Sequence, residues 1–275
     1  MIKFLRSLIH RVLSDNISFL AGGVAFYGLL AIFPAMAAIV SLFGLLANPH
    51  IVHEQLNALQ VLFPPNVFDI LQKQLGTLLA QSSRSLSLTA VFSILLTIYS
   101  ATKGTKAMLA ALNAVYRTNE TRKWWFQQIL AYCLTFGGLL LMIIAVFAVI
   151  AVPVILRILP DDILVHLSVP LEALRWVALS SAIFFGLFIL FLFGPNRPCA
   201  QSRSRALFWG AFLSTALWIA TAVGGSLAIQ LIPSVNAAYG SFGAIIGLML
   251  WIYFSAYIVL FGGAITATSE EYLQQ

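Results

Sequence analysis

Polar aromatic and basic residues at helical spacing are the side chains of this chain best suited to contact a substrate. Tyr253 and Tyr257 lie four residues apart and share one face of a helix. Tyr99 and Lys103 have the same spacing, and share a face if their helix continues past Thr102. A hydroxyl or ammonium group deep in an apolar segment needs a hydrogen-bond partner or a wet cavity. The pattern therefore favours binding of a polar or anionic group.

The candidate substrate-path residues are Tyr27, Pro34, Tyr99, Ser100, Lys103, Trp251, Tyr253 and Tyr257. As a group they predict a polar lining for a path through the membrane. Pro34 would kink its helix, because proline removes one backbone hydrogen bond. The alternative interpretation is that the polar members bond between helices and only hold the bundle together.

Catalytic chemistry has little support in the residues. None of the long apolar segments holds an Asp, Glu or His at mid-depth, which counts against a buried acid or base. His50, His53 and Glu54 form a cluster without an evident third zinc ligand. No phosphate-binding, dinucleotide-binding or nucleophile-elbow string is present. We therefore expect no enzyme activity, no catalytic residue, no metal and no cofactor.

The elements that position these residues are long apolar segments. The chain has 275 residues, of which 61% are hydrophobic and only 9% charged, a mix that excludes an ordinary soluble domain. Six segments approach or exceed the roughly 17–25 residues that cross a bilayer. They are Leu20–Ala47, Leu86–Thr102, Gln127–Leu156, Trp176–Phe193, Ala206–Ile232 and Ser241–Thr268. The sequence predicts an all-α, polytopic membrane protein with six transmembrane helices.

The basic residues predict its orientation. Eleven of the 15 fall on one alternating set of connections: Lys3, Arg6, Arg11, Lys103, Lys106, Arg117, Arg122, Lys123, Arg197, Arg203 and Arg205. The other four are Lys73, Arg84, Arg157 and Arg175. Because Lys and Arg are retained on the cytoplasmic side, this bias predicts that both termini are cytoplasmic.

A single membrane domain is predicted, with residues 1–17 as a cytoplasmic amphipathic helix, 18–268 as the six-helix core and 269–275 as a cytoplasmic tail. In the first part, Ile2–Leu13 would place apolar side chains against lipid and Lys3, Arg6 and Arg11 at the headgroups. Asp15 or Asn16 would cap the next helix.

Two connections are predicted to form interfacial helices of their own, Asn66–Gln81 outside and Gly104–Arg117 inside. Glycines are predicted to let helices approach closely. These are Gly22–Gly23, Gly137–Gly138, Gly224–Gly225, Gly243 with Gly247, and Gly262–Gly263.

Several strings in order resemble the YihY/BrkB family of bacterial membrane proteins, once labelled ribonuclease BN. They are Asp15-Asn16 leading into LAGGVAFYGLLAIFP, then YSATKGTKAMLAALNAVYR, Pro195-Asn196-Arg197, and AYGSFGAIIGLMLWIYFSAYIVLFGGAITA. The family motif also includes Asn113, Tyr116, Glu120 and Arg122, which we expect to hold the cytoplasmic helix in place. One departure is that the family's usual closing acid aligns with Ala264 or Ile265.

The resemblance implies a multi-pass protein of a bacterial cytoplasmic (inner) membrane, active in envelope biology. Together with the polar aromatics it favours transport or flipping of a lipid or other amphiphile, with Lys103 pairing an anionic headgroup. The alternative is a non-transporting scaffold or assembly factor. Ribonuclease activity and a nucleic-acid partner are not expected, because the cytoplasmic connections offer Glu120 as their one acid. The expected partner is the lipid bilayer, including anionic lipid, with a homo-oligomer or membrane-protein partner left open.

Overall fold

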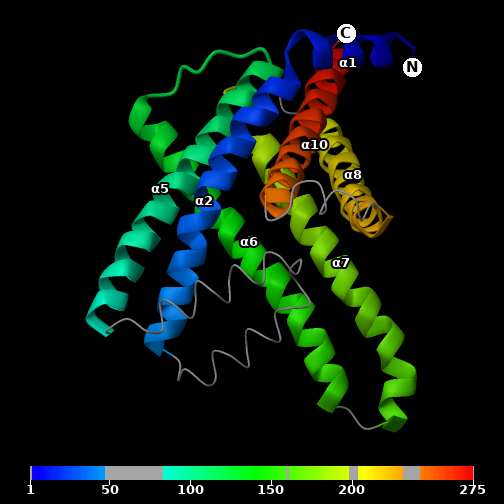
Figure 1. The fold of residues 1–275 in the computed structure, drawn as a ribbon. Helices are drawn as coiled ribbons and strands as arrows, with labels where there is room; N and C mark the ends of the chain where they lie inside the picture. The colour runs from blue at the N-terminus through cyan, green and yellow to red at the C-terminus, as the bar shows by residue number, and fades with distance from the viewer. Residues whose placement is uncertain (1, 47–82, 159–160, 198–203, 232–241, 275) are drawn as a thin grey trace. The chain divides into compact units, whose positions relative to one another are not determined.

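The computed structural model describes residues 2–46, 83–158, 161–197, 204–231 and 242–274 (Figure 1). All regular structure within these ranges is α-helical, which confirms the predicted class for this part of the chain. The helices are α1 (Ile2–Ser14), α2 (Ile17–Leu46), α5 (Ser83–Val115), α6 (Trp124–Ile158), α7 (Asp161–Phe193), α8 (Ser204–Leu231) and α10 (Phe242–Gln274). The predicted helix Asn66–Gln81 and the His50, His53 and Glu54 cluster lie outside the described residues.

Among the described residues, four helices are long and apolar enough to cross a membrane, over Trp124–Leu141, Trp176–Phe193, Ser204–Gly224 and Ile246–Leu273. The bent pair formed by α1 and the first part of α2 also passes this test. Only 11% of the α6 and α7 windows is buried within the chain, so most of their apolar side chains need an apolar surrounding. The chain is a membrane protein with several apolar helices, whereas the six crossings and their orientation stay predictions.

Helix α5 corrects one prediction. Gly104–Arg117 was expected to be a separate interfacial helix, but a single helix runs from Ser83 to Val115. Leu109, Leu112 and Val115 are buried in protein rather than laid on a bilayer surface. A glycine inside a helix costs only about 1 kcal/mol, and this burial offsets the cost of Gly104.

Hydroxyl side chains within the apolar helices bond back to their own backbone. Thr102 donates to the carbonyl of Ile98 at 2.6 Å, Thr135 to Ala131 at 2.7 Å and Ser214 to Gly210 at 2.8 Å. These i to i−4 bonds satisfy the hydroxyl without a second helix. Such residues therefore fit an apolar surrounding and need not mark a path.

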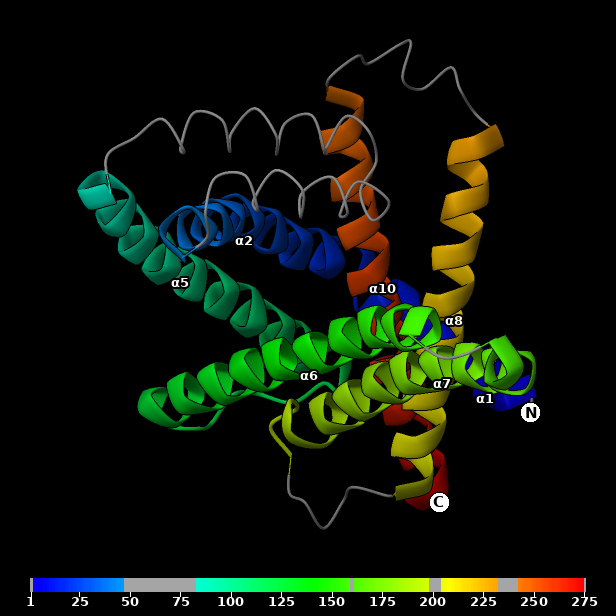
Figure 2. The same ribbon diagram turned by 90° about the horizontal axis from the view of Figure 1, so that it is seen from below.

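The chain forms two compact units. Unit 1 comprises Met1–Ala21, Met108–Ser226 and Ser255–Gln275, and unit 2 comprises Gly22–Ala107 and Leu227–Phe254. In unit 1, α6 and α7 lie side by side (Figures 1 and 2). In unit 2, a Cβ on Gly104 of α5 would lie 3.7 Å from the Tyr27 Cβ of α2, and one on Gly28 would lie 2.9 Å from Ile252 of α10.

Glycines bring α8 and α10 together in unit 1. A Cβ on Gly210 would overlap the Thr266 hydroxyl, and a Cβ on Gly262 would overlap the Ser214 hydroxyl. The prediction of close packing is confirmed at Gly262 and at Gly263, where a Cβ would lie 2.8 Å from Leu112.

At other glycines the described residues provide no neighbouring helix. A Cβ on Gly22, Gly23, Gly137, Gly138, Gly224 or Gly247 would meet no other atom of the described chain within 4 Å. A glycine pattern shows which helix faces are small, but it does not show which of them another helix covers.

Candidate functional site

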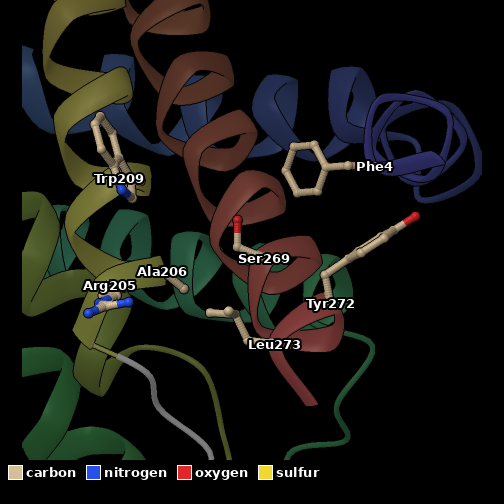
Figure 3. Close-up of a pocket in the computed structure, with 7 residues that line it drawn as sticks. All are labelled: Phe4, Arg205, Ala206, Trp209, Ser269, Tyr272 and Leu273. Atoms are coloured by element: carbon tan, nitrogen blue, oxygen red, sulfur yellow. The ribbon is translucent and has the colours of Figure 1, made fainter. Parts of the chain in front are cut away.

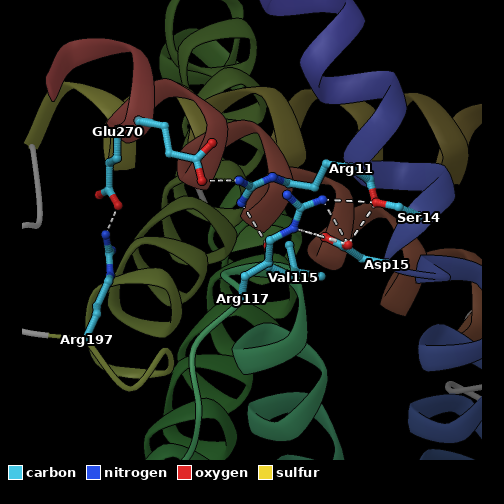
Figure 4. Close-up of polar contacts among 8 residues, drawn as sticks. Arg11, Ser14, Asp15, Val115, Arg117, Arg197 and Glu270 are labelled. Carbon is cyan, nitrogen blue, oxygen red and sulfur yellow. Dashed lines mark hydrogen bonds and ion pairs between the residues drawn. The ribbon is translucent and has the colours of Figure 1, made fainter. Parts of the chain in front are cut away.

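Charged and amide side chains gather where α1, α5, α7 and α10 end and α6 begins, all within unit 1. We call this cluster the charged junction. It consists of Arg11, Asp15, Asn113, Tyr116, Arg117, Glu120, Arg122, Asn196, Arg197, Glu270 and Glu271. Figure 4 shows part of it, with Glu270 facing Arg197 and Arg117 facing Asp15.

Two arginine–glutamate pairs hold the end of α10. Arg11 of α1 pairs with Glu271 and also donates to the Val115 carbonyl at 2.9 Å. Arg11 was predicted to meet lipid headgroups, but its side chain is only 2% exposed. The prediction failed because helical spacing shows which residues share a face, and α1 turns the Arg11 face toward protein.

The second pair is more completely buried. Arg197 pairs with Glu270, and the two side chains are 4% and 7% exposed. Arg197 also donates to the Phe191 carbonyl at 3.0 Å and lies 4.7 Å above the Tyr116 ring. A buried cation with a carboxylate, a carbonyl and an aromatic face around it is well compensated.

Tyr116 is itself buried in the junction. Burial raises the pKa of its phenol to about 12, against the opposing effects of the Arg197 cation, the Thr266 hydroxyl and the Arg11 cation. The phenol is neutral at physiological pH, and its ring packs against the Arg197 guanidinium group.

Asn113 joins the connections that flank it. Its amide nitrogen donates to Glu120 at 2.9 Å, and its oxygen accepts from the Asn196 backbone at 2.7 Å. Arg122 caps the end of α7 by donating to the carbonyls of Gly194 at 3.0 Å and Pro195 at 2.8 Å. The structure thus links the family-motif residues Asn113, Glu120 and Arg122, and it places Tyr116 against Arg197 in the same junction.

The corner between α1 and α2 carries an exposed pair. Arg117 donates to Asp15 at 3.2 Å and to the Ser14 hydroxyl at 3.0 Å. Asn16 has a φ of 50°, a left-handed conformation that asparagine tolerates. Its carbonyl accepts from Phe19 and Leu20, so Asn16 begins α2 as the N-cap residue.

A second cluster lies on α5 within unit 2, and we call it the lysine face: Tyr99, Lys103 and Lys106. The Lys103 ammonium lies 5.3 Å from the centre of the Tyr99 ring, so the two share a face of a continuous helix, as predicted. Burial lowers the pKa of Lys106, and the Lys103 cation lowers it further. Neither lysine forms an ion pair with any described residue.

The remaining substrate-path candidates are distributed between the units. Tyr27, Pro34, Ser100, Trp251 and Tyr253 belong to unit 2, where Ser100 is buried and Tyr253 packs edge-on against Phe254. Tyr257 belongs to unit 1.

Trp218, another aromatic residue deep in an apolar segment, donates to Ser255 at 3.1 Å. For this pair the polar contact joins α8 to α10, as the bundle-holding interpretation requires.

Sequence reasoning missed the roles of Glu270 and Glu271. They belong to a predicted cytoplasmic tail, where acids carry little weight for orientation. A usable signal was present, since they are an acidic pair at the end of a helix whose predicted side is rich in arginine. Among the described residues, no three His, Cys, Asp or Glu side chains lie close enough together to hold a metal.

The comparison that decides the family covers nearly the whole chain. A family profile described as virulence factor BrkB matches residues 8–275. The chain belongs to the BrkB family. Ala264 is 0% exposed, so an acidic side chain at this position would lie in protein rather than in water.

Individual relatives are similar to the chain over nearly its whole length. A putative ribonuclease-like protein, YfkH, of Bacillus subtilis (strain 168) is 24% identical over 96% of this chain and 94% of its own length. A UPF0761 membrane protein of Vibrio vulnificus (strain YJ016) is 27% identical over 98% and 83%. A UPF0761 membrane protein of Cronobacter sakazakii is 27% identical over 99% and 90%. No solved structure matches the chain.

Proposed function

We propose that the chain crosses the cytoplasmic membrane of a bacterium six times, with both termini inside and Leu86–Thr102 of α5 as the second crossing. The clustering of Arg11, Arg117, Arg122 and Arg197 at one end of unit 1 supports this orientation, since positive charges are retained in the cytoplasm. Single cysteines at Ser14 and at Arg175, without the native cysteines, provide the test. A membrane-impermeant maleimide added to intact cells should label only the second, and labelling of the first would refute the orientation.

We further propose that the protein transports or flips a lipid or other amphiphile with an anionic headgroup. The observation that carries this proposal is the lysine face. Lys103 and Lys106 are partly buried, lie three residues apart with the same charge, and have no acidic partner among the described residues. Holding two like charges together costs free energy that a bound anion would offset.

The neighbouring residues suit a headgroup attached to an apolar body. Tyr99 offers an exposed ring and a hydroxyl beside Lys103, and Tyr27 packs at Gly104 on the next residue of α5. In this proposal Lys103 and Lys106 bind the phosphate, while Tyr99 and Tyr27 line its path. Tyr253, which belongs to the same unit, extends this lining, and Tyr257 of unit 1 is a separate candidate.

The test is movement of fluorescent phosphatidylglycerol across proteoliposomes, followed by quenching of the outer leaflet. Lys103→Gln combined with Lys106→Gln should slow it roughly thirtyfold, as expected for two lost charge contacts. Lys123→Gln, an exposed lysine before α6, is the matched control and should retain the wild-type rate. An equal rate in all three proteins would refute lipid transport through the lysine face.

A second test concerns the tyrosines. Replacement of both Tyr253 and Tyr257 by Phe keeps ring volume and removes only the hydroxyls. Transport should fall while the thermal unfolding midpoint stays near that of the wild type. Unchanged transport in this variant would remove both tyrosines from the path.

The alternative function is a scaffold or assembly factor, and the open glycines favour it. Gly137 and Gly138 of α6 have no neighbour in the described chain, so a helix of another protein could approach closely there. Replacement of both by Leu should abolish partner binding by a scaffold and leave lipid transport unchanged.

Nuclease chemistry is not part of the proposal. Phosphodiester cleavage needs free carboxylates or an acid and base pair at the scissile phosphate. In the charged junction, Glu120, Glu270 and Glu271 are already bound to asparagine or arginine.

A further inference from the structure

A pocket of about 280 Å³ lies in unit 1, whereas the lysine face belongs to unit 2. Its walls come from α1, α8 and α10, with Phe4, Arg205, Trp209, Tyr272 and Leu273 around it (Figure 3). The volume is just below the roughly 300–1,000 Å³ of clefts that enclose a drug-sized molecule. It therefore suits a compact group rather than a complete lipid.

The chemistry of the walls is selective. Among the described residues that line this pocket, Arg205 is the one with a charge, and the others are mainly aromatic or apolar. Arg205 is exposed and forms no ion pair with a described residue. It lies in the first turn of α8, which contains no acid, so the free backbone N–H groups of that turn add to the positive potential.

Helix α1 has the residue pattern of a helix that lies on a bilayer surface. Leu5, Ile9 and Leu13 form an exposed apolar stripe at helical spacing. Lys3, Arg6 and His10 form an exposed stripe beside it. An apolar stripe with flanking basic residues is typical of a helix that lies in the headgroup region.

The third face of α1 connects it to the pocket. Phe4, at the start of that face, contacts the Tyr272 ring edge-on at 5.7 Å between centroids. Trp209 remains 55% exposed, as expected for an interfacial tryptophan that contacts lipid. The pocket therefore has one wall on the helix that lies among headgroups.

We propose that this pocket binds the headgroup of one anionic phospholipid, with the phosphate on Arg205 and the acyl chains along Trp209 and Leu273. A guanidinium presents paired donors to phosphate oxygens, and the first turn of α8 favours the same anion. The aromatic walls contact the glycerol region. This lipid is a resident ligand of unit 1, and its binding does not depend on transport through the lysine face.

Native mass spectrometry of protein released from nanodiscs of phosphatidylcholine and phosphatidylglycerol tests the site. Arg205→Gln should lower retention of phosphatidylglycerol about fivefold, the effect of one basic contact at a membrane surface. Lys123→Gln, which removes the same charge outside the pocket, should retain as much as the wild type. Equal retention in Arg205→Gln and wild type, or an equal loss in both variants, would overturn the proposal.

A second pair of variants tests the effect of a negative charge at the pocket. Leu273 is 43% exposed at the pocket, so Leu273→Asp adds a carboxylate without disturbing a core. It should reduce phosphatidylglycerol retention as much as Arg205→Gln, whereas Leu273→Asn should change it little. If Leu273→Asp retains the wild-type amount, the headgroup does not occupy this pocket. Lys103→Gln should keep the lipid, which separates this proposal from the transport proposal.

Discussion

The charged junction and the lysine face use basic residues in opposite ways. In the junction, Arg11 and Arg197 each have a glutamate partner and a backbone carbonyl. On the lysine face, Lys103 and Lys106 have each other as neighbours and no ion pair with a described residue. A satisfied cluster stabilises one arrangement of helix ends, whereas an excess of one charge leaves binding capacity for an anion. This difference is the basis for our proposal that the charged junction is structural and that the lysine face binds a ligand.

The largest effect should come from breaking the most buried ion pair. Glu270→Gln leaves the Arg197 cation buried without its carboxylate, which costs roughly 3–5 kcal/mol. Thermal unfolding in detergent, followed by circular dichroism, would measure the loss. A paired replacement, Arg197→Met with Glu270→Leu, should recover much of it. A loss below about 1 kcal/mol would contradict the structural role of the junction.

The next effect concerns Tyr116 and pH. Its pKa is raised to about 12, so the folded state keeps the phenol proton more tightly than the unfolded state does. Its contribution to stability is complete below about pH 10, the unfolded value, and is lost as pH rises toward about 12. Over that window the wild type should lose on the order of 2 kcal/mol more than Tyr116→Phe. Parallel alkaline unfolding curves would show that Tyr116 ionises as it does in water.

A smaller effect tests whether packing as well as charge distinguishes unit 1. Gly262→Ala forces a methyl group onto Ser214, at a net cost of about 1–2 kcal/mol after the gain in helix propensity. Gly138→Ala, where the methyl group meets no atom, is the matched control and should not destabilise the protein. Adding Ser214→Gly to Gly262→Ala should restore part of the loss. Equal unfolding midpoints for both alanine variants would argue against close packing of α8 on α10.

The smallest effect is expected at the exposed edge of the junction. Arg117 is 49% exposed, so Arg117→Gln should cost less than about 1 kcal/mol although it removes the bonds to Asp15 and Ser14. A cost equal to that of Glu270→Gln would mean that burial does not govern the strength of these pairs.

Much of the fold followed from apolar segment length, because a bilayer requires long uninterrupted helices. The segment Trp176–Phe193 was predicted to be helical and lies within α7. The sequence predicted that one helix ends at Thr102 and another begins at Gly104, but a single helix continues through both residues. The charge of Lys103 and the flexibility of Gly104 do not end a helix whose other face is packed. Local sequence could not show that packing.

The sequence predicted the lysine face better than it predicted the charged junction. The shared face of Tyr99 and Lys103 followed from spacing alone, since both lie on one helix. The burial of Arg11 did not, because its partners Glu271 and Val115 are far from it in sequence. Contacts between remote segments decide whether a basic residue meets lipid or protein, and the pattern of a single helix does not contain that information.

The most direct test compares two losses of one charge, Lys103→Gln on the lysine face and Arg117→Gln in the charged junction. The measured quantity is the rate of phosphatidylglycerol movement per folded molecule in proteoliposomes. A lower rate in Lys103→Gln, with the wild-type rate in Arg117→Gln and similar unfolding midpoints for both, is the predicted result. Equal rates in the two variants and the wild type would contradict the division between a structural junction and a ligand-binding lysine face.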